Sequence, residues 1–207
     1  MMAGRTRDIG VAIGIPEPFR TELQTWRERF GDPNAGFIVP HVTLLAPTAV
    51  PDLRLGDIER HLAEVAVGTT RFRIRLRGSG TFRPLSPVVY VTLAMGITCC
   101  EMLQEAVRSG PLARPMRFAY HPHVTVAHDI DEEGLDRAWE ALADYEAEFD
   151  VDGFGLYERG EDHVWRELRH FSFASRSVRG GRASGGRARP EGHGRSATRN
   201  GMRRPYV

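Results

Sequence analysis

The sequence predicts an α+β fold built from two similar lobes, and three observations lead to this prediction. The tetrapeptides His41–Leu44 and His123–Val126 both read His-Val-Thr followed by an apolar residue, and they begin 82 residues apart. Each falls in a stretch with the alternating apolar pattern of a strand. Helical and strand patterns also follow the same order in the two halves of residues 8–173, which indicates an internal duplication.

The first lobe, residues 8–77, contains three predicted strands that alternate with two predicted helices. Strands are predicted where apolar residues alternate with small or polar ones, and helices where apolar residues recur every three or four positions. In chain order these are a strand at 9–15, a helix at 19–30, a strand at 37–45, a helix at 57–68 and a strand at 71–77. We expect Asp57 to cap the second helix. The four arginines of the last strand could follow an RNA backbone, but we favour the solvent side of an edge strand.

The second lobe, residues 88–173, repeats this order and ends with one additional strand. In chain order we predict a strand at 88–95, a helix at 98–108, a strand at 118–127, a helix at 131–145 and two hairpin strands at 149–158 and 164–173. Thr98 followed by Glu101 forms a capping-box pattern at the start of the first helix. Asp131 is expected to cap the second helix.

The composition indicates one folded region in residues 1–175. Hydrophobic residues make up 41% of the 207, which is enough for a sizeable core. No run of about 18 apolar residues occurs, and the N-terminus lacks the apolar segment of a signal peptide, so we expect a cytoplasmic protein without membrane contact. The two cysteines, Cys99 and Cys100, are adjacent and imply no disulfide framework. We expect a monomer, and the sequence implies no protein partner.

Residues 176–207 differ from the rest of the chain. They contain nine arginines and one acidic residue, whereas the first 175 residues carry a net charge of −7. Gly, Arg, Ser, Ala and Pro dominate this tail, so it cannot offset its ordering entropy by burial, and we predict that it is disordered. Its charge could bind RNA, or it could be a solvated tail without a specific role.

The two motifs place reactive groups on one face of each predicted strand. Side chains two positions apart share a face, so His41 lies beside Thr43, and His123 lies beside Thr125. If the two strands face one another, two imidazoles can exchange protons and two hydroxyls can hold a developing negative charge. This combination indicates chemistry on a phosphate. A third His-x-Ser triplet, at 170–172, has no counterpart in the first lobe, and we interpret it as structural.

The paired motifs resemble those of the 2H phosphoesterases, a family that includes the bacterial 2′-5′ RNA ligases and cyclic nucleotide phosphodiesterases. The resemblance covers roughly residues 8–173, and Pro122 before the second motif also looks like the family. We therefore expect a bilobal, pseudo-twofold α+β fold in which two antiparallel sheets face a central cleft and the helices lie outside.

This resemblance also implies an enzymatic activity. The family cleaves phosphodiesters without a metal, typically a 2′,3′-cyclic phosphate or a related linkage on RNA or a nucleotide, and the reverse reaction is 2′-5′ RNA ligation. His41 and His123 would be the catalytic acid and base, in an order that the similar motifs leave open. Thr43 and Thr125 would bind the substrate phosphate. No cofactor is implied.

Two alternatives to this hypothesis stay open. A catalytically weak RNA- or nucleotide-binding protein would have the same cleft. A zinc site could form from His121, His123 and His128 together with His41, but no carboxylate or Cys ligand has a suitable spacing, and we expect no metal. His128 would instead line the cleft as a weak, pH-dependent cation.

Four aromatic residues are candidates either for stacking on a nucleobase or, as we favour, for the hydrophobic core. They are Phe82, Tyr90, Tyr120 and Trp165.

Overall fold

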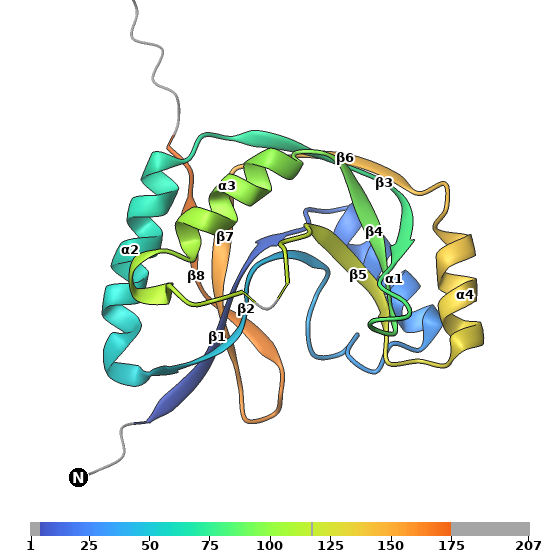
Figure 1. The fold of residues 1–207 in the computed structure, drawn as a ribbon, viewed down its shortest axis with the longest axis horizontal. Coiled ribbons are helices and arrows are strands. Elements are labelled where there is room, and N and C mark those ends of the chain that lie inside the picture. Colours follow the sequence, from blue (N-terminus) through green and yellow to red (C-terminus); the bar gives the residue numbers. More distant parts are fainter. Residues whose placement is uncertain (1–4, 117, 175–207) are drawn as a thin grey trace, which may run out of the picture. The chain divides into compact units, whose positions relative to one another are not determined.

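The computed structural model describes residues 5–116 and 118–174, which belong to one compact unit of the chain. They form two four-stranded sheets, in which all neighbouring strands are antiparallel, and four α-helices (Figure 1). The predicted α+β class with two antiparallel sheets is therefore confirmed. The predicted tail at 176–207 lies outside the described residues.

The first sheet has the strand order β2-β1-β7-β8, and the second has the order β5-β4-β3-β6. The strands of the first sheet are β1 (Thr6–Gly14), β2 (His41–Pro51), β7 (Gly153–Arg159) and β8 (Trp165–Ser172). Those of the second are β3 (Phe72–Thr81), β4 (Val88–Met95), β5 (His123–His128) and β6 (Glu146–Val151). Two short 3-10 helices occupy Asp52–Arg54 and Gly110–Leu112.

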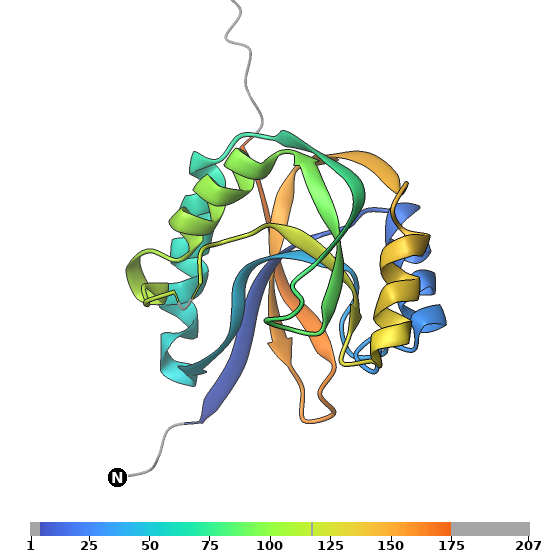
Figure 2. The same cartoon turned by 45° about the vertical axis from the view of Figure 1, so that its right-hand side comes forward.

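The helices form two pairs on opposite sides of the sheets (Figures 1 and 2). One pair, α2 (Leu55–Gly68) and α3 (Ile97–Val107), packs against β8 and β2 of the first sheet. The other pair, α1 (Phe19–Phe30) and α4 (Glu132–Ala141), packs against the second sheet. Each pair takes one helix from each half of the chain. Among the described helices, none is long and apolar enough to cross a membrane.

The two sheets do not coincide with the two halves of the chain. Strand β3 begins within 8–77 but belongs to the second sheet, whereas β7 and β8 lie within 88–173 and belong to the first. The predicted strand at 149–158 is in fact two strands, β6 and β7, which are separated by Asp152 and lie in different sheets. The chain therefore crosses between the sheets at Asp152, and the predicted lobes exchange strands.

The position of β3 corrects the interpretation of its arginines. Strand β3 lies between β4 and β6, so it is not an edge strand. Its arginines form ion pairs with acidic residues of β6, such as Arg73 with Glu148 and Asp150, both at 2.9 Å. Arg75 pairs in the same way with Glu146. The basic face of β3 is thus neutralised within the sheet and is not a free surface for RNA.

The three predicted helix caps are correct in one case and wrong in two. Asp131 caps α4, since its carboxylate accepts a hydrogen bond of 2.7 Å from the backbone N–H of Gly134. Asp57 lies inside α2, which already begins at Leu55. In α3 no side chain caps the helix, because Gly96 precedes it with a left-handed φ of 92°. A side chain at this glycine would collide with a backbone oxygen of β3, 2.7 Å from its Cβ.

The alternating burial of the motif strands orients the site. Val42, Leu44, Val124 and Val126 are at most 1% exposed and pack into the hydrophobic core between sheets and helices. Burying each of these side chains contributes about 1.5–3 kcal/mol. Because neighbouring side chains in a strand point to opposite faces, this anchoring turns the histidines and threonines toward the other face.

Candidate active site

The two motifs lie at the starts of edge strands from the two sheets. His41 is the first residue of β2, and His123 is the first residue of β5. Each strand lies at the edge of its sheet, and the two strands contact one another. The Tyr120 hydroxyl donates a hydrogen bond of 2.9 Å to the Thr43 carbonyl oxygen, which joins the segment before β5 to β2. The motifs are therefore brought together from 82 residues apart.

The strand register is the same around both motifs. Each histidine and each threonine pairs with one residue of the neighbouring strand, and the register shifts directly after the threonine. The pairs are Gly14–His41, Ala12–Thr43, Thr92–His123 and Tyr90–Thr125. Such a shift changes the alternation, and accordingly Val126 and Ala127 are both buried. His128 then lies half-buried on the side of His123, at the position that Ala46 has in β2.

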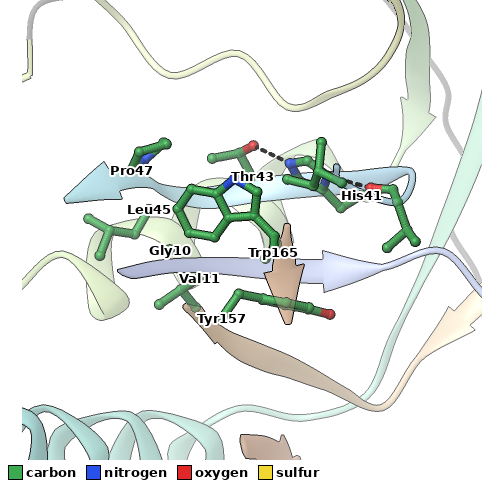
Figure 3. A pocket seen from close by; sticks show the side chains of 11 residues that line it. Gly10, Val11, His41, Thr43, Leu45, Pro47, Tyr157 and Trp165 are labelled. Atoms are coloured by element: carbon green, nitrogen blue, oxygen red, sulfur yellow. Dashed lines mark hydrogen bonds between the residues drawn. The ribbon is translucent and has the colours of Figure 1, made fainter. Parts of the chain in front are cut away.

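Both imidazoles are held in the same way. The Nδ1 atom of His41 lies 2.8 Å from the Val39 carbonyl oxygen, and that of His123 lies 2.6 Å from the His121 carbonyl oxygen. A carbonyl only accepts, so Nδ1 carries the proton in both rings and Nε2 is the unprotonated nitrogen, which can accept a hydrogen bond. In His41 this Nε2 lies 3.1 Å from the Thr43 hydroxyl (Figure 3).

The surroundings favour the neutral form of both histidines. Burial lowers the pKa of His41 to about 4, against the opposing effect of its carbonyl hydrogen bond. The positive charge of Arg27 and the nearby His123 lower this pKa further. Burial also lowers the pKa of His123, against the opposing effect of its hydrogen bond to the His121 carbonyl, and the nearby His121 ring lowers it further. Both shifts therefore favour the uncharged ring in the free protein.

The loop that leads into the first motif is held by a buried ion pair. Arg27 on α1 lies 3.0 Å from Asp32, and their side chains are 4% and 0% exposed. Arg27 also donates to the carbonyl oxygen of Ile38, one residue before the carbonyl that anchors His41. Sequence reasoning missed this residue, although an arginine in the apolar stripe of a helix, between Leu23 and Phe30, was a detectable signal.

Two cavities adjoin the motif residues. The larger, about 640 Å³, lies beside His123 and is mainly apolar, with Phe82 and Tyr120 among its lining residues. The smaller, about 50 Å³, is a pocket beside His41 that is bordered by Trp165 (Figure 3). Thr43 lines both cavities.

Comparison with known proteins identifies the family. Residues 15–163 match the model of the 2′-5′ RNA ligase superfamily. The chain belongs to this superfamily. The predicted resemblance is confirmed, and the protein is a phosphoesterase of the 2H type.

Similar proteins support this assignment, and solved structures share the fold. A "Putative phosphoesterase" of Bacillus cytotoxicus is 27% identical over 159 residues, which is 76% of this chain and 91% of that protein. One of Bacillus pumilus is 28% identical over 75% of this chain and 91% of its own. Crystal structures of E. coli LigT with 3′-AMP and with ATP share the fold, with TM-scores of 0.62 and 0.60. They are 21% and 23% identical and cover 83% of this chain and 100% of theirs.

The remaining predicted site residue, Thr125, lies beside His123 on β5 in this superfamily member. It is half-buried and pairs with Tyr90, but it lines neither of the two cavities. The two halves of the site are thus alike in backbone but not in side-chain surroundings. On the His41 side the neighbours opposite the motif are Gly14 and Ala12, which leave more space.

The aromatic candidates have different positions. Phe82 and Tyr90 lie against the His123 ring, with centroid distances of 4.9 and 5.1 Å. Tyr90 is 7% exposed, so the core interpretation is confirmed for it, and Tyr120 packs partly buried against the core. For Trp165 the core interpretation is wrong, because its indole is partly exposed and borders the small pocket.

The other histidines have ordinary partners. His128 lies 3.4 Å from Asp129, and His170 of the third triplet lies 3.1 Å from Glu167. His121 stacks beside His123 with a centroid distance of 6.1 Å. Within residues 5–116 and 118–174, no group of three or more His, Cys, Asp or Glu side chains is arranged to hold a metal ion.

Proposed function

We propose that the protein is a metal-independent phosphodiesterase that opens 2′,3′-cyclic phosphates or related phosphodiester ends of RNA or nucleotides. The observation that carries the proposal is the matched pair of motifs on adjacent edge strands, in which both imidazoles are held through Nδ1 by a backbone carbonyl. LigT, whose fold this chain shares, has been crystallised with 3′-AMP and with phosphate, which supports a nucleotide ligand.

The residues suggest a direct hydrolytic mechanism. We assign the base to His41, because burial keeps its ring neutral, with a pKa of about 4, and the unprotonated Nε2 can take a proton as water attacks. Water attacks phosphorus and gives its proton to His41, while the bond from phosphorus to one ribose oxygen breaks. His123, in its protonated form, gives a proton to the departing oxygen. The hydroxyls of Thr43 and Thr125 donate to the non-bridging oxygens.

The acid requires a proton on His123, which burial disfavours in the free protein. Burial lowers the pKa of His123, so a second charge has to favour its imidazolium form. The negative phosphodiester supplies this charge, because an anion close to an imidazole raises its pKa. Substrate binding is therefore expected to be accompanied by proton uptake.

The test is hydrolysis of 2′,3′-cyclic AMP by the purified protein in the presence of a chelator. His41→Ala and His123→Ala are each expected to lower kcat by roughly 10²–10⁴-fold. His170→Ala is the matched control, because it belongs to the third triplet and the only hydrogen bond of its imidazole within the described residues is to Glu167. Full activity in either motif variant would refute the assignment. Activity that a chelator removes and added metal restores would refute metal independence.

The same experiment addresses the alternative function. A protein that binds cyclic AMP but does not turn over any cyclic or linear phosphodiester would be a nucleotide-binding member with the same cleft.

A further inference from the structure

We propose that Tyr90 is a positioning residue that fixes the ring of His123, and that Gly80 provides the space that this contact requires. The proposal rests on the proposed phosphodiesterase function, in which His123 gives a proton to the departing oxygen. Tyr90 acts through the histidine, because it is not among the described residues that line the two cavities beside the motifs.

The two histidines are restrained differently. His41 has a hydrogen-bonding contact at each ring nitrogen, to the Val39 carbonyl oxygen at Nδ1 and to the Thr43 hydroxyl at Nε2. Within the described residues, the ring of His123 has one such contact, from Nδ1 to the His121 carbonyl oxygen. A single hydrogen bond lets the ring tilt about it. The orientation of His123 therefore depends on contacts that use neither nitrogen and leave Nε2 available for the substrate.

Two aromatic rings make these contacts. The Tyr90 centroid lies 5.1 Å from that of His123, with 53° between the ring planes. The Phe82 centroid lies 4.9 Å from that of His123, with 86° between the planes, which is the edge-to-face arrangement that aromatic pairs favour. Phe82 and Tyr90 also contact one another, at 4.4 Å. Each of the three rings thus touches the other two, and a tilt of the imidazole would disturb both of its contacts.

The strand register places Tyr90 for this role. On β4, Tyr90 pairs with Thr125 of β5 on one side and with Gly80 of β3 on the other. Paired side chains share a face of the sheet, so Tyr90 lies on the face that carries Thr125 and His123. A Cβ at Gly80 would lie only 2.7 Å from the Tyr90 ring. Glycine inside a strand marks such close approaches, and here it lets the ring lie flat across β3.

The segment after β3 holds Phe82 as a support for Tyr90. The backbone N–H of Phe82 donates a hydrogen bond of 3.1 Å to the carbonyl oxygen of Val88 on β4. The next residue, Arg83, forms ion pairs of 2.7 and 2.8 Å with Glu132 and Asp136 of α4. The phenyl ring is therefore tied to both β4 and α4, and Tyr90, which is 7% exposed, has little room to move.

A fixed ring matters because proton transfer depends on direction. The proton on Nε2 has to lie within hydrogen-bond reach of the departing oxygen. A misplacement of about 1 Å can slow a reaction by roughly 10²-fold, and residues that lock the rotamer of a catalytic side chain prevent this. Apolar ring contacts do so without competing for the proton.

The first test compares Tyr90→Leu with Tyr90→Phe in the hydrolysis of 2′,3′-cyclic AMP. Tyr90→Leu is expected to lower kcat by roughly 10- to 100-fold with KM unchanged, because the ring contact is lost and no cavity residue is altered. Tyr90→Phe keeps the ring and is expected to keep kcat. Wild-type kcat in Tyr90→Leu, or an equal loss in Tyr90→Phe, would overturn the proposal.

Tyr145→Leu is the matched control. Tyr145 is 8% exposed, so the substitution leaves a similar cavity, but it directly precedes β6, at the opposite edge of the sheet from β5. We expect a comparable loss of stability in urea unfolding without a loss of kcat. A similar fall of kcat in Tyr145→Leu would show that destabilisation alone explains the effect, and would overturn the proposal.

Gly80→Ala tests the same contact without removing a ring. The new methyl group has to displace the Tyr90 ring, so kcat is expected to fall, whereas Gly36→Ala, with nothing within 4 Å of its Cβ, is expected to keep it. Wild-type kcat in Gly80→Ala would overturn the role of Gly80. A rise in KM that differs between 2′,3′-cyclic AMP and 2′,3′-cyclic UMP would show that Tyr90 recognises the base, and would overturn the positioning role.

A measurement on the free protein separates this proposal from the proposed function. Imidazole ¹⁵N chemical shifts show which ring nitrogen carries the proton, and in the wild type this is expected to be Nδ1 in both His41 and His123. Tyr90→Leu is expected to mix the two tautomers of His123 but not those of His41. An unmixed His123 tautomer would overturn the proposal. If the wild type turns over no phosphodiester but Tyr90→Leu still mixes the His123 tautomers, the proposed function fails and the positioning contact stands.

Discussion

Replacement of Arg27 by methionine is expected to destabilise the protein strongly. The substitution leaves the Asp32 carboxylate, whose side chain is 0% exposed, without its ion-pair partner. Breaking a buried ion pair by removing one partner costs about 3–5 kcal/mol, because the remaining charge stays buried. For a domain of this size that corresponds to a fall in Tm of roughly 6–20 °C. The Ile38 carbonyl also loses its donor, so the loop that anchors His41 is loosened.

The measurement is urea unfolding together with calorimetry at pH 7. Arg60→Met is the control, because its ion pair with Asp57 is 68% and 55% exposed and is expected to contribute about 0–1 kcal/mol. The double variant Arg27→Met with Asp32→Asn is expected to recover part of the loss, since no buried charge remains unpaired. If Arg27→Met is no less stable than Arg60→Met, the buried pair does not have the role assigned to it.

Three further predictions follow from the site and the fold. The pKa of His41 is lowered to about 4, so the unfolded chain binds more protons than the folded protein between pH 6.5 and 4. The free energy of unfolding should therefore fall by at most about 3 kcal/mol as the pH is lowered from 6.5 to 4. In pH-dependent unfolding experiments, His41→Gln should flatten this dependence. Thr43→Val should lower kcat by roughly 10²–10³-fold and Thr125→Val by less, because of the two threonines only Thr43 lines the cavities. Equal kcat values for the two variants in steady-state assays would contradict this. Gly96→Ala, at a φ of 92°, should lower the free energy of unfolding by about 1–3 kcal/mol in urea titrations, whereas Gly68→Ala, with nothing within 4 Å of its Cβ, should not.

The motif strands could be predicted from the sequence because the relevant signal is local. His-Val-Thr occurs twice with apolar residues at the alternate positions, and the strand period alone places His41 and His123 on the faces opposite those apolar residues. The amphipathic helices follow from a similar local pattern. Strand β2 extends past Pro47, beyond the predicted end at 45, because an edge strand tolerates a missing backbone donor.

The exchange of strands could not be predicted from periodicity, because alternation shows which face is buried but not which strand is the neighbour. A signal was nevertheless present at Asp152. In β6 the buried side chains occupy odd-numbered positions and end at Val151. In β7 the large buried side chains, Phe154 and Leu156, occupy even-numbered positions. This change of phase marks the crossing between sheets. The pairing of Arg27 with Asp32 likewise depends on a loop whose course the sequence pattern does not specify.

The crossing at Asp152 has a consequence for how the protein acquires activity during synthesis. Strand β1, near the start of the chain, is completed by β7, which leaves the ribosome after both motifs have been made. A nascent chain that ends before residue 153 therefore contains every motif residue, but β1 still has an unpaired edge and the Trp165 wall is missing. Long-range pairing of this kind is slow to form, since a long loop has to close first. We expect catalytic competence to arise late and in one step, when the C-terminal hairpin docks.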